Sequence, residues 1–317
     1  MKRKFLILLL SGAALVLSCS RADIELPGNS ISFKPVAAKS TKAIINGTTY
    51  PTDQTFAVSA YHNGSAEYFA DLTASYSPGI ALWETSVSQY WPLGGSLTFV
   101  AFSPSTAGAS ITSAGVSLTG YVDSTAAQMA TDLCYATYTV ADCAAHPASV
   151  PLTFSHALAQ VVFRVKAAAY YGSNVSLAMN SLSITGINST GDFSSAASPM
   201  WSNQATARTY PLSSSATAMT YGEGNAPDAI DVCSNLFIPQ SISADARIIV
   251  GYSVTQNVSS VDYTLTNAPV SIPLRGTVTQ WEPGKKYIYT LNIGMDAITF
   301  TATASDWNEI DGGFVVQ

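Results

Sequence analysis

The chain has 317 residues, and only 11% of them are charged, whereas an ordinary soluble domain has about 25%. Its 47% hydrophobic residues are enough to build a core, which excludes a chain kept disordered by low hydropathy and high charge. A formal net charge of -6 excludes a general nucleic-acid-binding protein, because phosphate contacts need clustered Lys and Arg. The length predicts two domains.

The N-terminus has the pattern of a bacterial lipoprotein signal peptide. Basic residues at 2–4 precede an apolar stretch over 5–17, which is too short to span a bilayer, since a spanning helix needs about 20 apolar residues. Residues 16–19 read Val-Leu-Ser-Cys and match the lipobox. We expect cleavage between Ser18 and Cys19, so that 1–18 is the signal peptide and Cys19 carries the acyl chains, palmitate among them.

Lipidation at Cys19 predicts where the protein resides. Each buried acyl CH₂ contributes about 0.8 kcal/mol to membrane attachment, so several chains give permanent anchoring. We therefore expect an outer-membrane lipoprotein exposed at the cell surface. An N-terminal anchor helix is the alternative.

Alternating apolar and polar residues predict strands along most of the chain. The expected strands cover 31–36, 55–61, 96–102, 116–121, 161–166, 247–254, 286–293 and 298–303. Helical spacing occurs only over 124–133. Many short strands separated by turn residues are typical of β-sandwiches. We expect an all-β protein with an N-terminal sandwich domain over 19–150 and a C-terminal sandwich domain over 151–317.

Three cysteines, Cys134, Cys143 and Cys233, remain beyond the signal peptide. In an oxidising compartment three thiols cannot all pair within one chain, and Cys134 with Cys143 is the favoured disulfide. Three buried free cysteines are the open alternative. No Cys-x-x-C motif occurs, so a thiolate zinc site or a redox motif has no support, and we expect no metal and no cofactor.

Catalytic motifs are also missing from the sequence. The histidines lack a zinc-binding motif, and neither a nucleophile elbow nor a phosphate-binding loop is present, so we expect no enzyme. His156 is interpreted as a structural histidine at the entrance to a strand. Aromatic residues such as Trp83 and Trp201 offer a second hypothesis, stacking on sugars in a carbohydrate-binding module, although core packing is the favoured interpretation of each.

Several phrases then follow one another in a familiar order. They are the lipobox, Leu-Thr-Phe-Val-Ala-Phe-Ser-Pro at 97–104, Phe-Ser-His-Ala-Leu-Ala at 154–159, Phe-Ile-Pro-Gln at 237–240, Pro-Gly-Lys-Lys-Tyr at 283–287 and Ser-Asp-Trp at 305–307. This ordered set resembles the fimbrillin-like lipoproteins of Bacteroidota, the subunits of type V pili, and it spans nearly the whole chain.

The resemblance implies two tandem transthyretin-like sandwiches and a structural role in a fimbrium. In polymerising members a protease removes the first strand, and a strand of the next subunit fills the groove, a form of β-augmentation. Ile31, Phe33 and Val36 are the side chains whose removal would open the core. The partners would be other fimbrial subunits, the outer membrane through the lipid, and receptors or glycans on host or bacterial surfaces.

Two departures from the family pattern favour an anchor or tip subunit over the repeating stalk. Arg21 is the only arginine between the signal peptide and Arg164, so an arginine-specific protease would leave the first strand in place, and processing would need cleavage at Lys39 or Lys42. The run 314–316 is also short for a donor strand. The alternative function is a lipid-tethered carbohydrate-binding module of a glycan uptake system.

Overall fold

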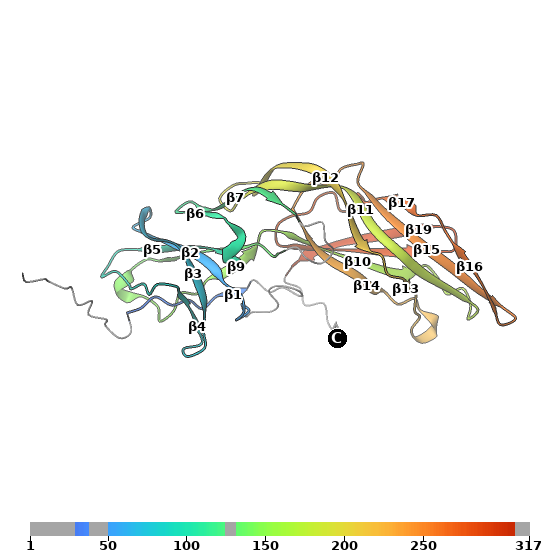
Figure 1. Cartoon of the computed structure of the whole chain (residues 1–317), viewed down its shortest axis with the longest axis horizontal. Helices are drawn as coiled ribbons and strands as arrows, with labels where there is room; N and C mark the ends of the chain where they lie inside the picture. Colours follow the sequence, from blue (N-terminus) through green and yellow to red (C-terminus); the bar gives the residue numbers. More distant parts are fainter. Residues whose placement is uncertain (1–28, 38–49, 124–130, 308–317) are drawn as a thin grey trace, which may run out of the picture.

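The computed structural model describes residues 29–37, 50–123 and 131–307. The predicted sites Ser18, Cys19, Lys39 and Lys42 and most of the expected helix lie outside these ranges. The described part of the chain is all-β and elongated, with one lobe built mainly by β1–β9 and another by β10–β19 (Figure 1). Its helical turns are three 3-10 segments, Ser105–Ala107, Cys143–Ala145 and Glu223–Asn225, and none of its helices is long and apolar enough to cross a membrane.

The first lobe is one seven-stranded sheet folded around a core, in the order β1-β9-β8-β5-β2-β3-β4. Its strands are β1 Val36–Ala37, β2 Phe56–His62, β3 Ala66–Ser77, β4 Leu82–Thr85, β5 Leu97–Ser103, β8 Cys134–Val140 and β9 Thr153–His156. Alternation in β5 places Phe99 and Ala101 in the core of this lobe, whereas Val100 and Phe102 face a second cluster. Both faces of β5 are apolar because both are covered.

The second lobe is a sandwich of two sheets. One has four strands in the order β14-β10-β18-β19, and the other has eight, with β11 at its centre. The four strands are β10 Ala159–Ala167, β14 Ile230–Phe237, β18 Lys285–Ile293 and β19 Ile298–Asp306. The eight are β6 Ser110–Thr112, β7 Gly115–Val122, β11 Val175–Ser194, β12 Trp201–Ser213, β13 Thr217–Ala218, β15 Arg247–Val258, β16 Val261–Thr266 and β17 Val270–Pro273.

The core of the second lobe follows the alternation of its strands. Val161, Phe163 and Val165 of β10 are fully buried, and they share one core with Ile248 and Val250 of β15. These side chains were expected on the inner face. The predicted all-β sandwich architecture is confirmed.

Near the junction, each lobe includes strands from the other half of the chain. β9 follows residue 150 in the chain but completes the first sheet beside β8, whereas β6 and β7 precede residue 150 and extend the eight-stranded sheet through β11. A third apolar cluster, with Phe102, Leu158, Phe193 and Trp201 among its members, joins the lobes. We propose that the two sandwiches are domains whose strands interlock, so that the packing boundary differs from the chain boundary.

β11 bends over its 20 residues, and one bend needs a glycine. The pairing of β11 with β12 shifts register between Thr185 and Ile187, and Gly186 between them has φ +80°. A Cβ at Gly186 would lie 3.0 Å from the Cα atom of Ala246.

We expect Gly186→Ala to lower the free energy of unfolding by about 2–3 kcal/mol, because it adds a backbone clash to an unfavourable φ. Gly120→Ala is the matched control, since Gly120 also has positive φ but open space around its Cβ position. Urea denaturation of both variants would measure the difference. Equal losses would mean that the close approach to Ala246 is unimportant.

Candidate functional site

The segment 29–37 lies between two parts of the first lobe and binds to both through its backbone. On one side the amide of Ile31 donates to Gln89 O at 2.7 Å, and Phe33 exchanges hydrogen bonds with Trp83 at 2.8 and 2.9 Å. On the other side the amides of Lys34 and Val36 donate to Val150 O and Leu152 O at 2.9 and 2.8 Å. The segment therefore connects the β4 edge of the sheet to the chain that enters β9.

The side chains of this segment fill the core of the lobe. Ile31 is 3% exposed and Phe33 is 0% exposed. The Phe33 ring makes edge-to-face contacts with Phe56 and Phe99, at centroid distances of 5.7 and 5.6 Å. Lys34 is exposed, because alternate side chains of a strand point to opposite faces. The expected strand 31–36 is regular only at β1, Val36–Ala37, and pairs elsewhere through isolated bridges at Ser30 and Phe33. The segment 29–37, called the first strand here, thus acts as an insert whose apolar face completes the core.

The residues predicted to plug the groove do not contribute equally. Ile31 and Phe33 belong to the core cluster, whereas Val36 is half-buried. Tyr50, the first residue of the next described range, closes the same core. Its ring packs on Phe154 at 5.2 Å, its hydroxyl lies 2.7 Å from Ser103 Oγ, and burial raises the pKa of its hydroxyl. The sequence pattern found Ile31 and Phe33 but did not indicate Tyr50.

The predicted disulfide between Cys134 and Cys143 is wrong in this structure, where Cys134, Cys143 and Cys233 are all free and buried. Cys134 begins β8, and Cys143 lies beyond its far end at Val140. Seven residues of a strand extend over about 20 Å, whereas a disulfide needs Cα atoms within about 7 Å. The two cysteines are only nine positions apart in the sequence, but the chain between them is mostly an extended strand. The alternative of three buried free cysteines describes the structure.

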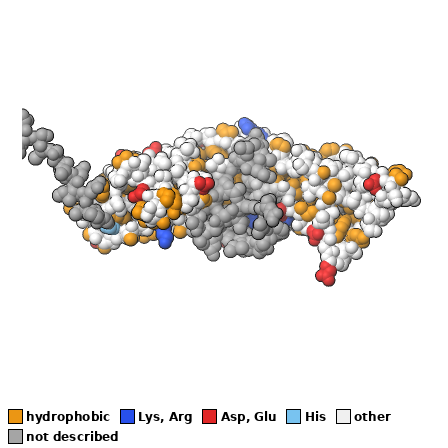
Figure 2. All heavy atoms as spheres, turned by 60° about the horizontal axis from the view of Figure 1, so that its bottom comes forward, with side chains coloured by type: hydrophobic (Ala, Val, Ile, Leu, Met, Phe, Trp, Pro, Cys, Tyr) orange, Lys and Arg blue, Asp and Glu red, His pale blue; other side chains and the backbone are white. Residues whose placement is uncertain are grey.

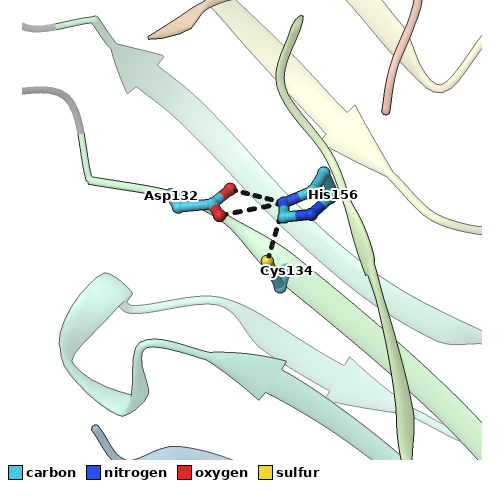
Figure 3. Close-up of side chains that lie close together, drawn as sticks. All are labelled: Asp132, Cys134 and His156. Carbon is cyan, nitrogen blue, oxygen red and sulfur yellow. Dashed lines mark hydrogen bonds and ion pairs between the residues drawn. The ribbon is translucent and has the colours of Figure 1, made fainter. Parts of the chain in front are cut away.

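The sequence showed no partners for His156, but the structure places two polar side chains against it. Its Nδ1 lies 2.9 Å from Asp132 Oδ2 and 3.4 Å from Cys134 Sγ, and all three residues are buried (Figure 3). Trp307, which follows β19 of the other lobe, stacks on the His156 ring at 3.9 Å with an interplanar angle of 17°. Burial, together with the Asp132 carboxylate, raises the pKa of the Cys134 thiol well above its ordinary value.

A cleft of about 800 Å³ opens beside this cluster at the junction of the lobes. His156, Trp201, Gln240, Trp281 and Asp306 are among its lining residues. Sequence reasoning missed the cleft, because its walls come from strands that are distant in the chain.

The tryptophans do not present the surface that a sugar-stacking site requires. All five, Trp83, Trp91, Trp201, Trp281 and Trp307, are buried. The indole of Trp201 donates to Ala157 O at 2.6 Å, and that of Trp83 donates to Gln54 O at 3.4 Å. These contacts agree with core packing, the favoured interpretation, and Trp83→Ala or Trp201→Ala would disturb folding before it reported on glycan binding.

The described surface has an apolar stripe at the far end of the second lobe. Val261, Tyr263 and Leu265 of β16 are 51–64% exposed. They lie on the core face of the eight-stranded sheet, since Leu265 pairs with the buried Val254. Figure 2 shows hydrophobic side chains at this end of the molecule, where Figure 1 places β16. Exposed apolar patches of this kind mark contact surfaces.

The fold and the inserted first strand define a class of protein: an all-β sandwich protein whose own N-terminal segment completes its core. A model of the fimbrillin-like family matches residues 41–307. The chain therefore belongs to the fimbrillin-like family.

Solved structures with the same fold come from Bacteroides species. A fimbrial protein from Bacteroides vulgatus is 17% identical, with 88% of this chain and 100% of that chain covered, and the TM-score is 0.59. Candidate cell adhesion proteins from Bacteroides uniformis and Bacteroides ovatus are 12% and 15% identical, with TM-scores of 0.53 and 0.51. These two alignments cover 88% and 89% of this chain and 98% and 99% of theirs. A search of the curated proteins finds no match.

Proposed function

We propose that the protein is a surface lipoprotein that serves as a fimbrial subunit or adhesin and joins its partners by donor-strand exchange. The observation that carries this proposal is the position of 29–37, which is bonded along both sides and places Phe33 in the core. Removing the segment would leave unpaired backbone groups on both sides of an apolar groove. An extended strand with apolar residues at alternate positions would pair with the backbone groups on both sides and fill the groove with its side chains.

Strand exchange can be tested with the purified chain. Cleavage by a lysine-specific protease at Lys39 or Lys42 would detach the first strand from the rest of the chain without removing it from the groove. We expect a labelled peptide with the sequence of residues 29–38 to exchange into the cut protein slowly and to remain bound through gel filtration. The same peptide carrying Phe33→Asp is the control, because a buried carboxylate without a partner is strongly unfavourable.

Equal retention of the two peptides, or retention of neither, would contradict strand exchange through this groove.

The anchor or tip role rests on processing and lipidation. No arginine lies between Arg21 and Arg164, and Arg164 lies in β10, where cleavage would break a central strand. We therefore propose that no protease removes the first strand, so that strand exchange at its groove requires a partner's strand to displace it, and that the lipid on Cys19 holds the subunit to the outer membrane. The apolar stripe on β16 is a further surface for contact with a partner subunit.

Mass spectrometry of the protein taken from the cell surface would test this role. An acylated Cys19 at the N-terminus is the expected result. An N-terminus at Ala43 without lipid would show that the first strand is removed, and it would make the protein a polymerising stalk subunit.

A further inference from the structure

The buried cluster of Asp132, Cys134 and His156 has the composition of a metal site. The three side chains offer an oxygen, a sulfur and a nitrogen ligand, and these atoms all lie within 4.8 Å of one another. Cys134 and His156 are direct cross-strand partners in β8 and β9, so their side chains project from the same face of the sheet. Asp132 lies two residues before the start of β8 and points at the same imidazole nitrogen (Figure 3).

The distances between the ligand atoms fit a small tetrahedral cation. Zinc lies about 2.0–2.2 Å from nitrogen and oxygen ligands and about 2.3 Å from sulfur, so neighbouring ligands in a tetrahedral site lie about 3.3–3.6 Å apart. In the structure His156 Nδ1 lies 3.4 Å from Cys134 Sγ and 2.9 Å and 3.1 Å from the two oxygens of Asp132. Shifts of a few tenths of an ångström would admit the ion. Each of the three residues supplies one ligand atom, so a tetrahedral ion would keep a fourth position for solvent.

The charges of the cluster also balance with a dication. A thiolate and a carboxylate together carry two negative charges, which a divalent ion cancels, so the filled site adds no net charge to the buried junction. Binding would release the thiol proton of Cys134 to solvent and would require the imidazole proton to lie on Nε2, which is buried without a hydrogen-bond partner among the described residues. The adjacent cleft, which has His156 in its wall, gives ion and solvent a route to the site.

The surroundings hold the ligands in place. The Trp307 ring stacks on His156, and the amide of Ala157 donates to Leu133 O at 2.7 Å, which fixes the backbone between the ligands. Rigid surroundings of this kind favour metal binding, because little ordering remains to be done when the ion enters.

We propose that Asp132, Cys134 and His156 form a site for a divalent cation of the zinc class, which joins β8 to β9 beneath the Trp307 ring at the junction of the lobes. This site is independent of strand exchange, since the groove residues Ile31 and Phe33 do not take part in it.

Cobalt is the direct probe of the site. We expect the chelator-treated chain to bind one Co²⁺, with a thiolate charge-transfer band in the near ultraviolet and the strong visible bands of tetrahedral cobalt. Cys134→Ser should abolish the charge-transfer band and weaken zinc binding by at least about tenfold. Cys143→Ser is the matched control, because Cys143 is also free and buried but lies beyond the other end of β8.

Two measurements on the unsubstituted chain keep the test decisive if a variant fails to fold. Saturating Zn²⁺ should raise the midpoint of thermal unfolding by about 4 °C or more over the chelator-treated chain. X-ray absorption of the zinc-loaded chain should show one sulfur at about 2.3 Å together with nitrogen and oxygen ligands. Three results would overturn the proposal. They are a zinc coordination shell without sulfur, an unchanged midpoint of thermal unfolding, and a thiolate-to-cobalt charge-transfer band that survives Cys134→Ser.

Discussion

Phe33→Ala is expected to lower the free energy of unfolding of the first lobe by about 3–5 kcal/mol, the usual loss when a buried phenylalanine is truncated. The ring is fully buried and packs edge-to-face on Phe56 and Phe99. Its removal costs transfer free energy and leaves a cavity, because the backbone of 29–37 is fixed by hydrogen bonds on both sides and cannot move in to fill it. Urea denaturation followed by tryptophan fluorescence would measure the loss.

Lys34→Ala is the matched control for this variant. Lys34 follows Phe33 in the same inserted segment, but its side chain is exposed, so its loss should change the free energy of unfolding by less than about 0.5 kcal/mol. If Phe33→Ala changed stability as little as Lys34→Ala, the first strand would not be an integral part of the core. The proposal that its removal opens a groove would then fail.

The second large effect is expected from Asp132→Ala, measured in the presence of a chelator so that only the side-chain contacts contribute. Asp132 and His156 form a pair whose side chains are 1% and 2% exposed, and breaking a buried pair by removing one partner costs about 3–5 kcal/mol. The reason is that the remaining polar group stays buried without its partner. Thermal or urea unfolding of the purified variant would give the value.

Two further variants separate this cost from a general effect of removing an aspartate. Asp231→Ala breaks the more exposed pair with Arg164, and we expect it to cost less than about 1 kcal/mol. Replacing both partners, Asp132→Leu with His156→Phe, should restore much of the stability lost in the single variant, because apolar residues of similar volume leave no unpaired group. A double variant less stable than Asp132→Ala would show that the pair is not the source of the loss.

The two predictions concern different parts of the molecule, the inserted first strand and the junction of the lobes. Phe33 tests how strongly the first strand is held, and hence what strand exchange would have to overcome. Asp132 tests what holds β8 and β9 together at the junction, where Trp307 of the second lobe covers His156.

Strand location was the part of the fold that the sequence predicted well, and β10, β15, β18 and β19 lie within a few residues of the expected ranges. The long strand β11 was missed. Its pairings with β12, β7 and β15 shift register several times, and each bulge breaks the period of two on which the prediction depends.

The candidate sites also divide into residues that the sequence identified and residues that only the structure brought together. The resemblance to the fimbrillin-like family identified Ile31 and Phe33, and their burial agrees with the alternation of side chains along an extended segment. The meeting of Asp132, Cys134 and His156 was not foreseen, because it depends on β8 pairing with β9 across more than twenty residues. The error at Cys134 and Cys143 has the same origin, since closeness along the chain becomes distance once the residues between them form a strand.

What the sequence alone determined is the composition of an acidic, weakly charged β protein, its strands and the side chains that face inward, because these follow from residue types and a period of two. Only the tertiary structure decided which edges the first strand joins, that all five tryptophans are buried, and that three donor side chains meet at the junction. Those features depend on strand pairing and register, which are set by contacts between residues far apart in the chain, and local sequence carries little information about such contacts.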